Sequence, residues 1–175
     1  MNEISQEELK RLFNYDPLTG VFKRRITTSS KAKAGDVVGT MTEGYLRCSI
    51  GYKPYLLHRL AWVYVYGALP NGKIDHINGD KSDNSISNLR DVTESQNQQN
   101  RLKAQSNNKS GYLGVSFIAS NQKYRAVIKH DGKLKILGDF DDPKVAHEVY
   151  LKAKLEMHTH ADRVKLMMNT AQSVF

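Results

Sequence analysis

The feature that most constrains the fold is a polar stretch at residues 98–110, which is rich in Gln, Asn, Lys and Ser and offers little that a core could bury. On either side of it, apolar residues recur in short runs with the periods of strands and helices. A chain of 175 residues suits one domain or two small ones. We therefore expect an α+β protein with an N-terminal domain over 1–100, a linker over 101–110, a second module over 111–160 and a tail over 161–175.

Charge is distributed unevenly along the chain. The net charge is +8, and residues 98–175 hold 13 Lys and Arg against seven acids, whereas residues 1–97 hold 13 against 11. Between residues 101 and 135 there are eight basic residues and one acid. This bias favours a polyanionic partner, because each Lys or Arg beside a phosphate releases condensed counterions.

Several protein classes are disfavoured by what the sequence lacks. No apolar run approaches the ~18 residues that a membrane span needs. The first four residues do not resemble a signal peptide. The single Cys48 excludes an intramolecular disulfide and any zinc site built from several cysteines. We expect an intracellular protein with no membrane partner and no small-molecule cofactor.

The first 67 residues read as short elements joined by turns. Ser5 and Glu8 form a capping box for a helix that should end near Phe13, and residues 16–20 read as a turn. Strands are expected at 21–25, 36–42, 45–50 and 54–57. A helix over 58–66 follows, with Gly67 as its stop.

The segment over 73–99 carries the candidate chemistry. Strands are expected at 73–77 and 89–92, with a polar loop over 78–87 between them and a helix from Glu94 behind the capping box of Thr93 and Gln96. Asp75 and His76 are adjacent on the first strand, so their side chains should leave on opposite faces unless the strand bulges. Asn97 lies one turn into the helix and could share a cation with Asp75, with His76 nearby as a base.

A calcium-binding loop is the alternative reading of residues 78–89. Counted as an EF-hand, this loop has Asp83 at the sixth position, where glycine is required. It has Leu89 at the twelfth position, where a bidentate Glu is required. The sequence therefore argues against calcium binding.

A resemblance to a known family follows from several motifs taken together. They are His58-Arg59-Leu60-Ala61-Trp62, Ile74-Asp75-His76-Ile77-Asn78-Gly79-Asp80, Asn84, Asn88-Leu89-Arg90 and Asn97. Over residues 9–101 the chain resembles the HNH endonucleases, specifically the phage homing type. The spacing agrees, with 12 residues from His76 to Asn88 and nine from Asn88 to Asn97.

The resemblance implies a ββα-metal unit with assigned roles. His76 would be the general base, and Asn88 would brace the loop and orient His76. Asp75 and Asn97 would hold one divalent cation. A carboxylate and an amide oxygen favour Mg²⁺ or Mn²⁺ over Zn²⁺. An imidazole with an ordinary pKa of about 6.5 suits the task of taking a proton from water.

Residues 111–160 predict a three-stranded antiparallel sheet and one packed helix. Strands are expected at 112–118, 123–130 and 133–140, with Asp131-Gly132 as a hairpin turn. Asp142 and Pro143 should open a helix. Its expected apolar face consists of Val145, Ala146, Val149, Tyr150 and Ala153.

This module resembles the DNA-binding domain of plant ethylene-response factors, through Tyr112-Leu-Gly-Val115, Lys123-Tyr-Arg-Ala126 and Leu137-Gly-Asp-Phe140. The resemblance implies a sheet that lies in the major groove. Strand alternation sends Tyr124, Ala126 and Ile128 toward the helix and Arg125, Val127 and Lys129 toward DNA. A one-residue slip of the third strand would exchange the faces of Lys135 and Ile136. The candidate DNA contacts are Lys23, Arg24, Arg25, Arg101, Ser116, Lys123, Arg125, Lys129 and Lys133.

These features predict a metal-dependent endonuclease that cuts double-stranded DNA at a specific site. It would act as a monomer that nicks one strand, in the cytoplasm of an infected or host bacterial cell. The main alternative is a DNA-binding regulator on a catalytically decayed HNH fold. An RNA-binding protein is a further alternative, which the narrow major groove of A-form RNA disfavours.

Overall fold

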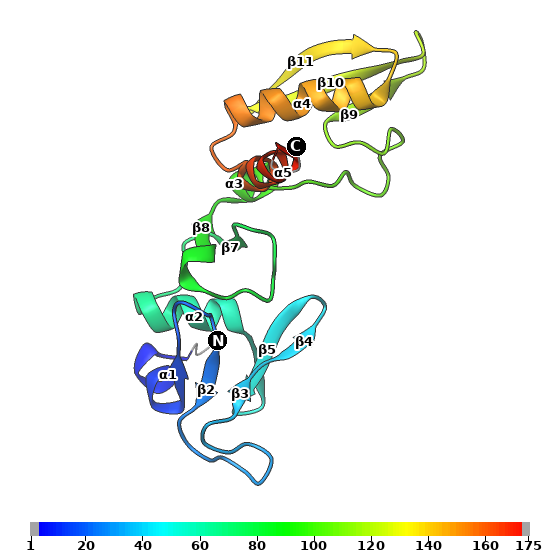
Figure 1. Ribbon diagram of the computed structural model, residues 1–175. Helices are drawn as coiled ribbons and strands as arrows, with labels where there is room; N and C mark the ends of the chain where they lie inside the picture. The colour runs from blue at the N-terminus through cyan, green and yellow to red at the C-terminus, as the bar shows by residue number, and fades with distance from the viewer. Residues whose placement is uncertain (1–3, 173–175) are drawn as a thin grey trace. The chain divides into compact units, whose positions relative to one another are not determined.

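The computed structural model in Figure 1 describes residues 4–172, without the side chains of residues 170–172. The chain divides into two compact units, Met1–Glu94 and Ser95–Phe175. Helices and small antiparallel sheets occur in both units, which confirms a mixed fold of helices and strands. Among the helices of residues 4–172, none combines the length and the apolar character required to cross a bilayer.

The first unit holds three small sheets. Its elements in chain order are α1 (Gln6–Leu12), β1 (Phe13–Tyr15), β2 (Phe22–Arg24), β3 (Val37–Val38), β4 (Thr40–Thr42), β5 (Tyr45–Ile50), β6 (Lys53–Leu56), α2 (Leu57–Tyr66), β7 (Lys73–His76), the 3₁₀ turn η1 (Ile86–Asn88) and β8 (Leu89–Val92). The strands pair in the orders β1-β2-β3, β4-β5-β6 and β7-β8. The hydroxyl of Ser5 accepts from the Glu8 N–H at 3.1 Å, so the predicted cap of α1 is confirmed.

Two differences from the expected strands have local causes. The strand expected over 36–42 is two strands, because Gly39 at φ +134° interrupts it. A Cβ at Gly39 would lie 2.8 Å from the Leu57 Cδ1, so only glycine fits this close approach. The sequence also missed β1, which directly follows α1 and pairs Phe13 with Arg24.

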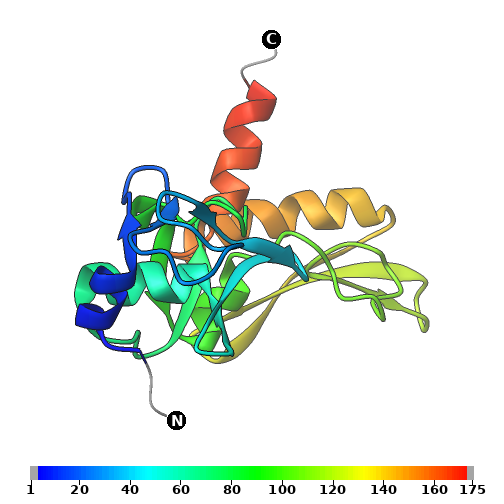
Figure 2. The same ribbon diagram turned by 90° about the horizontal axis from the view of Figure 1, so that it is seen from below.

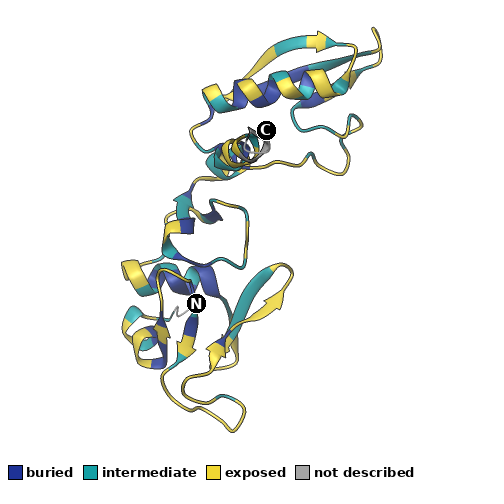
Figure 3. Ribbon diagram, viewed as in Figure 1, coloured by how far each residue is buried: buried dark blue, intermediate teal, exposed yellow. Residues whose placement is uncertain are grey.

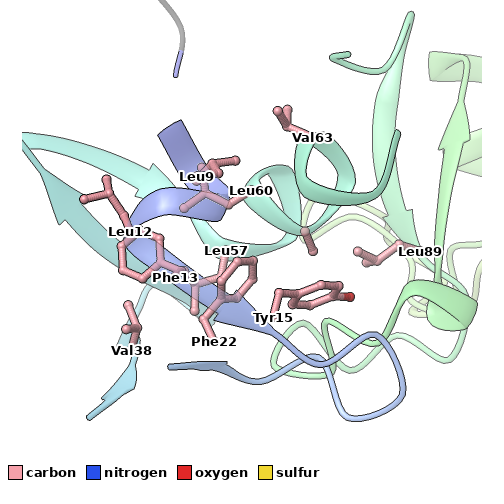
Figure 4. Close-up of a cluster of buried hydrophobic side chains, with 11 residues drawn as sticks. Leu9, Leu12, Phe13, Tyr15, Phe22, Val38, Leu57, Leu60, Val63 and Leu89 are labelled. Atoms are coloured by element: carbon pink, nitrogen blue, oxygen red, sulfur yellow. The ribbon is translucent and has the colours of Figure 1, made fainter. Parts of the chain in front are cut away.

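The core of the first unit gathers side chains from α1, α2 and the first sheet (Figure 4). The Tyr15 and Phe22 rings lie 4.6 Å apart, and Phe13 meets Phe22 edge-on at 6.1 Å. Leu57, Leu60 and other residues of α2 complete the cluster. Gly67 at φ +75° ends α2 as predicted, and its N–H donates to the Val63 carbonyl.

The second unit is built on a three-stranded sheet with a helix against one face. Its elements are α3 (Glu94–Gln99, which spans the boundary), β9 (Val115–Ile118), β10 (Lys123–His130), β11 (Lys133–Phe140), α4 (Pro143–Met157) and α5 (Asp162–Gln172). The strand order is β11-β10-β9, and α4 lies along the sheet (Figures 1 and 2). Figure 2 shows that α5 runs in a different direction from α4. The predicted sheet and packed helix are therefore confirmed, and Val164 of α5 is buried in the same core.

The register of the sheet settles the faces of its strands. Buried Ala126 and Ile128 face α4, as expected from alternation. A bulge places Val127 opposite Ile136 and Ala126 opposite Gly138. Ile136 therefore shares the open face with Val127, whereas Lys135 stands opposite Ile128 on the helix side.

One expectation about α4 is wrong. Val145 is exposed rather than part of the buried face. Figure 3 shows buried and exposed residues alternating along α4, and the buried set includes Leu151 and Lys154 in addition to Ala146, Tyr150 and Ala153. The Lys154 ammonium donates to the Arg101 carbonyl, which satisfies a group that burial would otherwise penalise.

Two glycines of the second unit provide a matched test of this packing. Gly114 and Gly111 have nearly the same backbone conformation, at φ +75° and +74°, so alanine imposes the same left-handed strain at both. A Cβ at Gly114 would lie 2.1 Å from the Tyr150 ring, whereas a Cβ at Gly111 would meet nothing within 4 Å. We expect Gly114→Ala to lower the free energy of unfolding by about 1–3 kcal/mol more than Gly111→Ala. Urea denaturation followed by circular dichroism measures the difference, and equal losses would contradict the packing of α4 on this segment.

Candidate active site

The hairpin of β7 and β8 places the two candidate catalytic residues on opposite faces. Asp75 stands opposite Arg90 and His76 stands opposite Leu89, which belongs to the core of the first unit. His76 therefore faces the core, and Asp75 faces the other side. Both side chains are buried, with 5% and 3% of their surfaces exposed.

The His76 ring is held by one amide and bordered by two other rings. Its Nε2 lies 3.2 Å from the Oδ1 of Asn84, which is itself buried. An amide oxygen only accepts, so in this arrangement Nε2 carries the proton and Nδ1 is the basic nitrogen. The His58 ring meets the His76 ring edge-on at 5.2 Å, and the Tyr45 ring lies 6.2 Å away. The Asn84 amide and the two neighbouring rings thus favour one orientation of the His76 ring.

His58 lies near the start of α2 and is buried to 6% exposure. Burial is the main cause that lowers the pKa of His58 to about 3, and the proximity of His76 and Arg59 contributes to this shift. Within residues 4–172, its Nδ1 has no hydrogen-bond partner. His58 is therefore a neutral ring that packs against His76 on its face of the hairpin.

The Asn88 side chain joins the start of the polar loop to its middle. Its Oδ1 accepts from the Asn78 N–H at 2.9 Å, and its Nδ2 donates to the Asp83 carbonyl at 2.8 Å. The Asn88 carbonyl also accepts from the Ile77 N–H at 2.9 Å, directly after His76. Asn88 thus joins two parts of the loop, and the Asn84 side chain contacts the His76 ring.

Two acids of the loop form hydrogen bonds within turns. Asp80 accepts from the N–H and the hydroxyl of Ser82, and these bonds hold the pKa of Asp80 below its usual value. Asp83 accepts from the N–H and the hydroxyl of Ser85 in the same way. Short polar side chains that bond to the backbone two residues on are typical of tight turns.

Asp75 is bound by Arg90 across the hairpin. Both Nε and Nη2 of Arg90 donate to the Asp75 Oδ2, at 3.1 and 2.8 Å. Ionised carboxylate oxygens offer about four lone-pair sites, so Asp75 can accept from Arg90 and also coordinate a hard cation. Asn97 lies in α3, and its role as a ligand stays a prediction. Within residues 4–172, no three His, Cys, Asp or Glu side chains are grouped as a metal site.

The basic candidates of the first unit lie on and after β2. Lys23 and Arg25 are exposed, and the Arg25 Nη1 donates to the Lys10 carbonyl at 2.7 Å. Arg24 is half-buried and lines a surface hollow with Lys31 and Arg47. The structure thus gathers Arg24 with two basic residues that the sequence did not single out as its neighbours.

The candidate DNA contacts of the second unit lie on both faces of its sheet, as the strand register shows. Ser116, Lys123, Arg125 and Lys129 share the open face, whereas Lys133 stands opposite His130 on the helix-side register. Two of these basic side chains already contact acids. Arg125 donates twice to Asp139, at 2.7 and 2.8 Å, and the Lys123 ammonium lies 3.4 Å from Asp141. Arg101 is exposed and offers its carbonyl to Lys154.

Sequence reasoning missed the direct neighbours of His76 and Asp75. Asn84 and Arg90 stood within the quoted motifs but received no role. Lys81, whose ammonium lies 4.3 Å from the centre of the Tyr45 ring, was also missed. The available signal was position: Asn84 sits in the loop between His76 and Asn88, and Arg90 can stand opposite Asp75 if the strands form a hairpin.

The segment that contains the candidate site is similar to a known protein family. Residues 55–99 match the family model of the HNH endonucleases. The match spans α2, the β7–β8 hairpin, its polar loop and α3. The HNH part of the predicted resemblance is therefore confirmed over these residues, and this segment supports a nuclease. The likeness of residues 111–160 to the plant domain stays a prediction.

Two relatives extend the comparison. The chain is 29% identical to Protein 3.8 of Escherichia phage T7 over 108 residues, which is 61% of this chain and 88% of that protein. A solved structure described as "DNA binding and cleavage by the HNH homing endonuclease I-HmuI" covers 85% of this chain and 82% of its own, with 24% identity and a TM-score of 0.43. A superposition this loose does not by itself establish a shared fold.

The buried, neutral His58 predicts an acid-dependent loss of stability. Between about pH 6.5 and 3 the unfolded chain binds a proton at His58 that the folded chain does not bind, so the free energy of unfolding falls as the pH falls. His58→Gln keeps a polar side chain but cannot titrate. We expect the stability of the wild type to fall more steeply than that of His58→Gln, by up to about 1.4 kcal/mol per pH unit. Urea denaturation at several pH values gives both slopes, and parallel curves would contradict a neutral His58.

Proposed function

We propose that this protein is a metal-dependent endonuclease that hydrolyses phosphodiester bonds in double-stranded DNA, of the homing type. The observation that carries the proposal is the His76 ring, buried and held at Nε2 by Asn84, inside the segment that matches the HNH endonuclease model. Phosphodiester hydrolysis requires a base for the attacking water, and a fixed neutral imidazole can act as that base.

The residues of the hairpin divide the chemistry between its two faces. His76 takes the proton of the attacking water through Nδ1, since Nε2 is bound to Asn84. Asp75 is the carboxylate that would hold Mg²⁺ or Mn²⁺, together with the proposed ligand Asn97. When bound, this cation stabilises the developing charge on the phosphate and the leaving oxygen. Arg90 fixes the Asp75 carboxylate, and Asn88 keeps the loop closed behind His76.

The second unit is proposed to bind the DNA through the open face of its sheet. On this face Lys129 is exposed and forms no ion pair with an acid within residues 4–172, unlike Lys123 and Arg125. Lys129 is therefore the side chain best placed to contact a phosphate. Ser116 stands beside Arg125 on the same face and can donate to the DNA backbone.

A single chain is proposed to cut one strand. The sequence contains one Asp75-His76 pair with one matching Asn97, and a single in-line displacement breaks one phosphodiester bond. A double-strand break would require a second site, such as that of a symmetric dimer on a palindromic target. We therefore propose a monomer that nicks its target.

Replacement of the base tests the proposed chemistry. His76→Gln should lower the single-turnover cleavage rate by about 100-fold or more, because general-base catalysis acts on the transition state. DNA affinity measured by gel shift should be unchanged. His147→Gln is the matched control, since His147 lies in α4 and contacts the Leu113 carbonyl. Near-wild-type cleavage by His76→Gln would reject His76 as the base, and intact specific binding without any wild-type cleavage would favour the decayed-fold regulator.

Charge removal on the sheet tests the DNA-binding face. Lys129→Gln should reduce the slope of log affinity against log salt by about 0.9, the value for one lost phosphate contact. Lys152→Gln removes the same charge from an exposed position of α4, on the far side of the unit, and should leave the slope unchanged. Gel shifts across a salt series give both slopes. Equal slopes for Lys129→Gln and the wild type would show that this face does not contact DNA.

A further inference from the structure

We propose that Tyr15 and the turn over residues 16–20, which lie outside the segment matching the HNH model, are positioning residues that fix Asn84 against the His76 ring. This inference rests on the proposed function, in which His76 is the base. It adds a part of the N-terminal region to the machinery of the site.

The link from the core to Asn84 is a buried hydrogen bond. The Tyr15 hydroxyl donates to the Asn84 carbonyl at 2.8 Å, and the two residues are 69 positions apart. Figure 4 shows the Tyr15 ring extending from the core group of Phe13 and Phe22 toward the side where Leu89 lies. The Tyr15 ring is fixed in turn by Phe22 at 4.6 Å and Tyr64 at 5.5 Å. The position of the Asn84 backbone is therefore set by the aromatic core.

The turn makes a second contact on the same backbone. The Pro17 carbonyl accepts from the Ile86 N–H at 3.0 Å. Gly20 has φ +72°, and a Cβ on it would lie 2.3 Å from the Asn84 carbonyl carbon. Only glycine permits this approach. Asp16 stiffens the turn, because it accepts from the Leu18 N–H and the Thr19 hydroxyl.

The Asn84 side chain links the position of its own backbone to the His76 ring. Asn84 is 1% exposed, and its Oδ1 lies 3.2 Å from the His76 Nε2. Its Nδ2 has no hydrogen-bond partner within residues 4–172. The position of the Asn84 backbone, rather than a second hydrogen bond from its amide, therefore decides where Oδ1 meets the ring. A shift of this backbone would release the bond that keeps the proton on Nε2.

Two substitutions test whether Tyr15 and the turn over residues 16–20 position Asn84, each with a matched control. Tyr15→Phe removes only the hydroxyl, and Tyr64→Phe removes a hydroxyl whose 3.5 Å contact is with Phe13 instead of the loop. Gly20→Ala drives a Cβ into Asn84, whereas Gly35→Ala at φ +91° meets nothing within 4 Å. Tyr15→Phe and Gly20→Ala should each lower the single-turnover cleavage rate about tenfold or more at unchanged DNA affinity. The controls should cut at the wild-type rate, and wild-type rates for Tyr15→Phe and Gly20→Ala would overturn the proposal.

A double-mutant cycle separates positioning from general loosening of the structure. If Tyr15 acts through the His76 ring, Tyr15→Phe should cause no further loss in the residual cleavage of His76→Ala. The same fold loss in both backgrounds would show that Tyr15 acts elsewhere and would overturn the positioning role.

The tautomer of the His76 ring tests the positioning role of Tyr15 without any measurement of cleavage. The ring ¹⁵N signals of His76, recorded at about pH 8.5 so that an ordinary imidazole is neutral, distinguish the two tautomers. The wild type should show the proton on Nε2, and Tyr15→Phe and Asn84→Ala should show a mixture. A wild-type tautomer in both variants would overturn the proposed positioning role of Tyr15 even if the enzyme cuts DNA. Failure of the wild type to cut any DNA would instead count against the proposed function. The ¹⁵N signals would still show whether Tyr15 positions Asn84 against the His76 ring.

Discussion

The clamp that Asn88 forms across the polar loop is the interaction on which the site depends. The loop over 78–87 buries little apolar surface, so its shape is set by hydrogen bonds. Asn88 joins the start of the loop at Asn78 to its middle at Asp83 and so closes it on itself. Asx turns fix two further parts of the loop, from Asp80 to Ser82 and from Asp83 to Ser85. Asn84 follows directly and reaches the His76 ring from this closed loop.

The two faces of the β7–β8 hairpin provide two electrostatic environments for adjacent residues. On one face, the His76 ring lies 5.2 Å from the His58 ring and 3.2 Å from the Asn84 amide. On the other face, Asp75 is bound by the Arg90 guanidinium. Strand alternation is enough to place the side chains of these two adjacent residues in different surroundings.

Much of this fold follows from local sequence signals, whereas the contacts of the site do not. The Ser5 N-cap, the stop at Gly67 and the Asp131-Gly132 turn are local patterns, and the structure contains all three. Strand alternation likewise predicted the helix-facing side of β10. The bond from Tyr15 to Asn84 joins positions far apart in sequence, so no periodicity could indicate it. The bulge that sets the faces of β11 depends on Leu137 being the extra residue opposite β10, which tertiary packing decides.

The central claim is that the wild-type chain cuts DNA with a bound divalent cation and one site per molecule. The most direct measurement is digestion of a supercoiled plasmid library carrying random inserts, at low enzyme, in Mg²⁺ and in parallel with excess EDTA. The account predicts that open circles accumulate first in Mg²⁺, at a restricted set of inserts, and that EDTA abolishes them. Plasmid left intact in Mg²⁺ would contradict the nuclease assignment, cleavage that persists in EDTA would contradict the metal requirement, and linear DNA formed without open circles would contradict the single site.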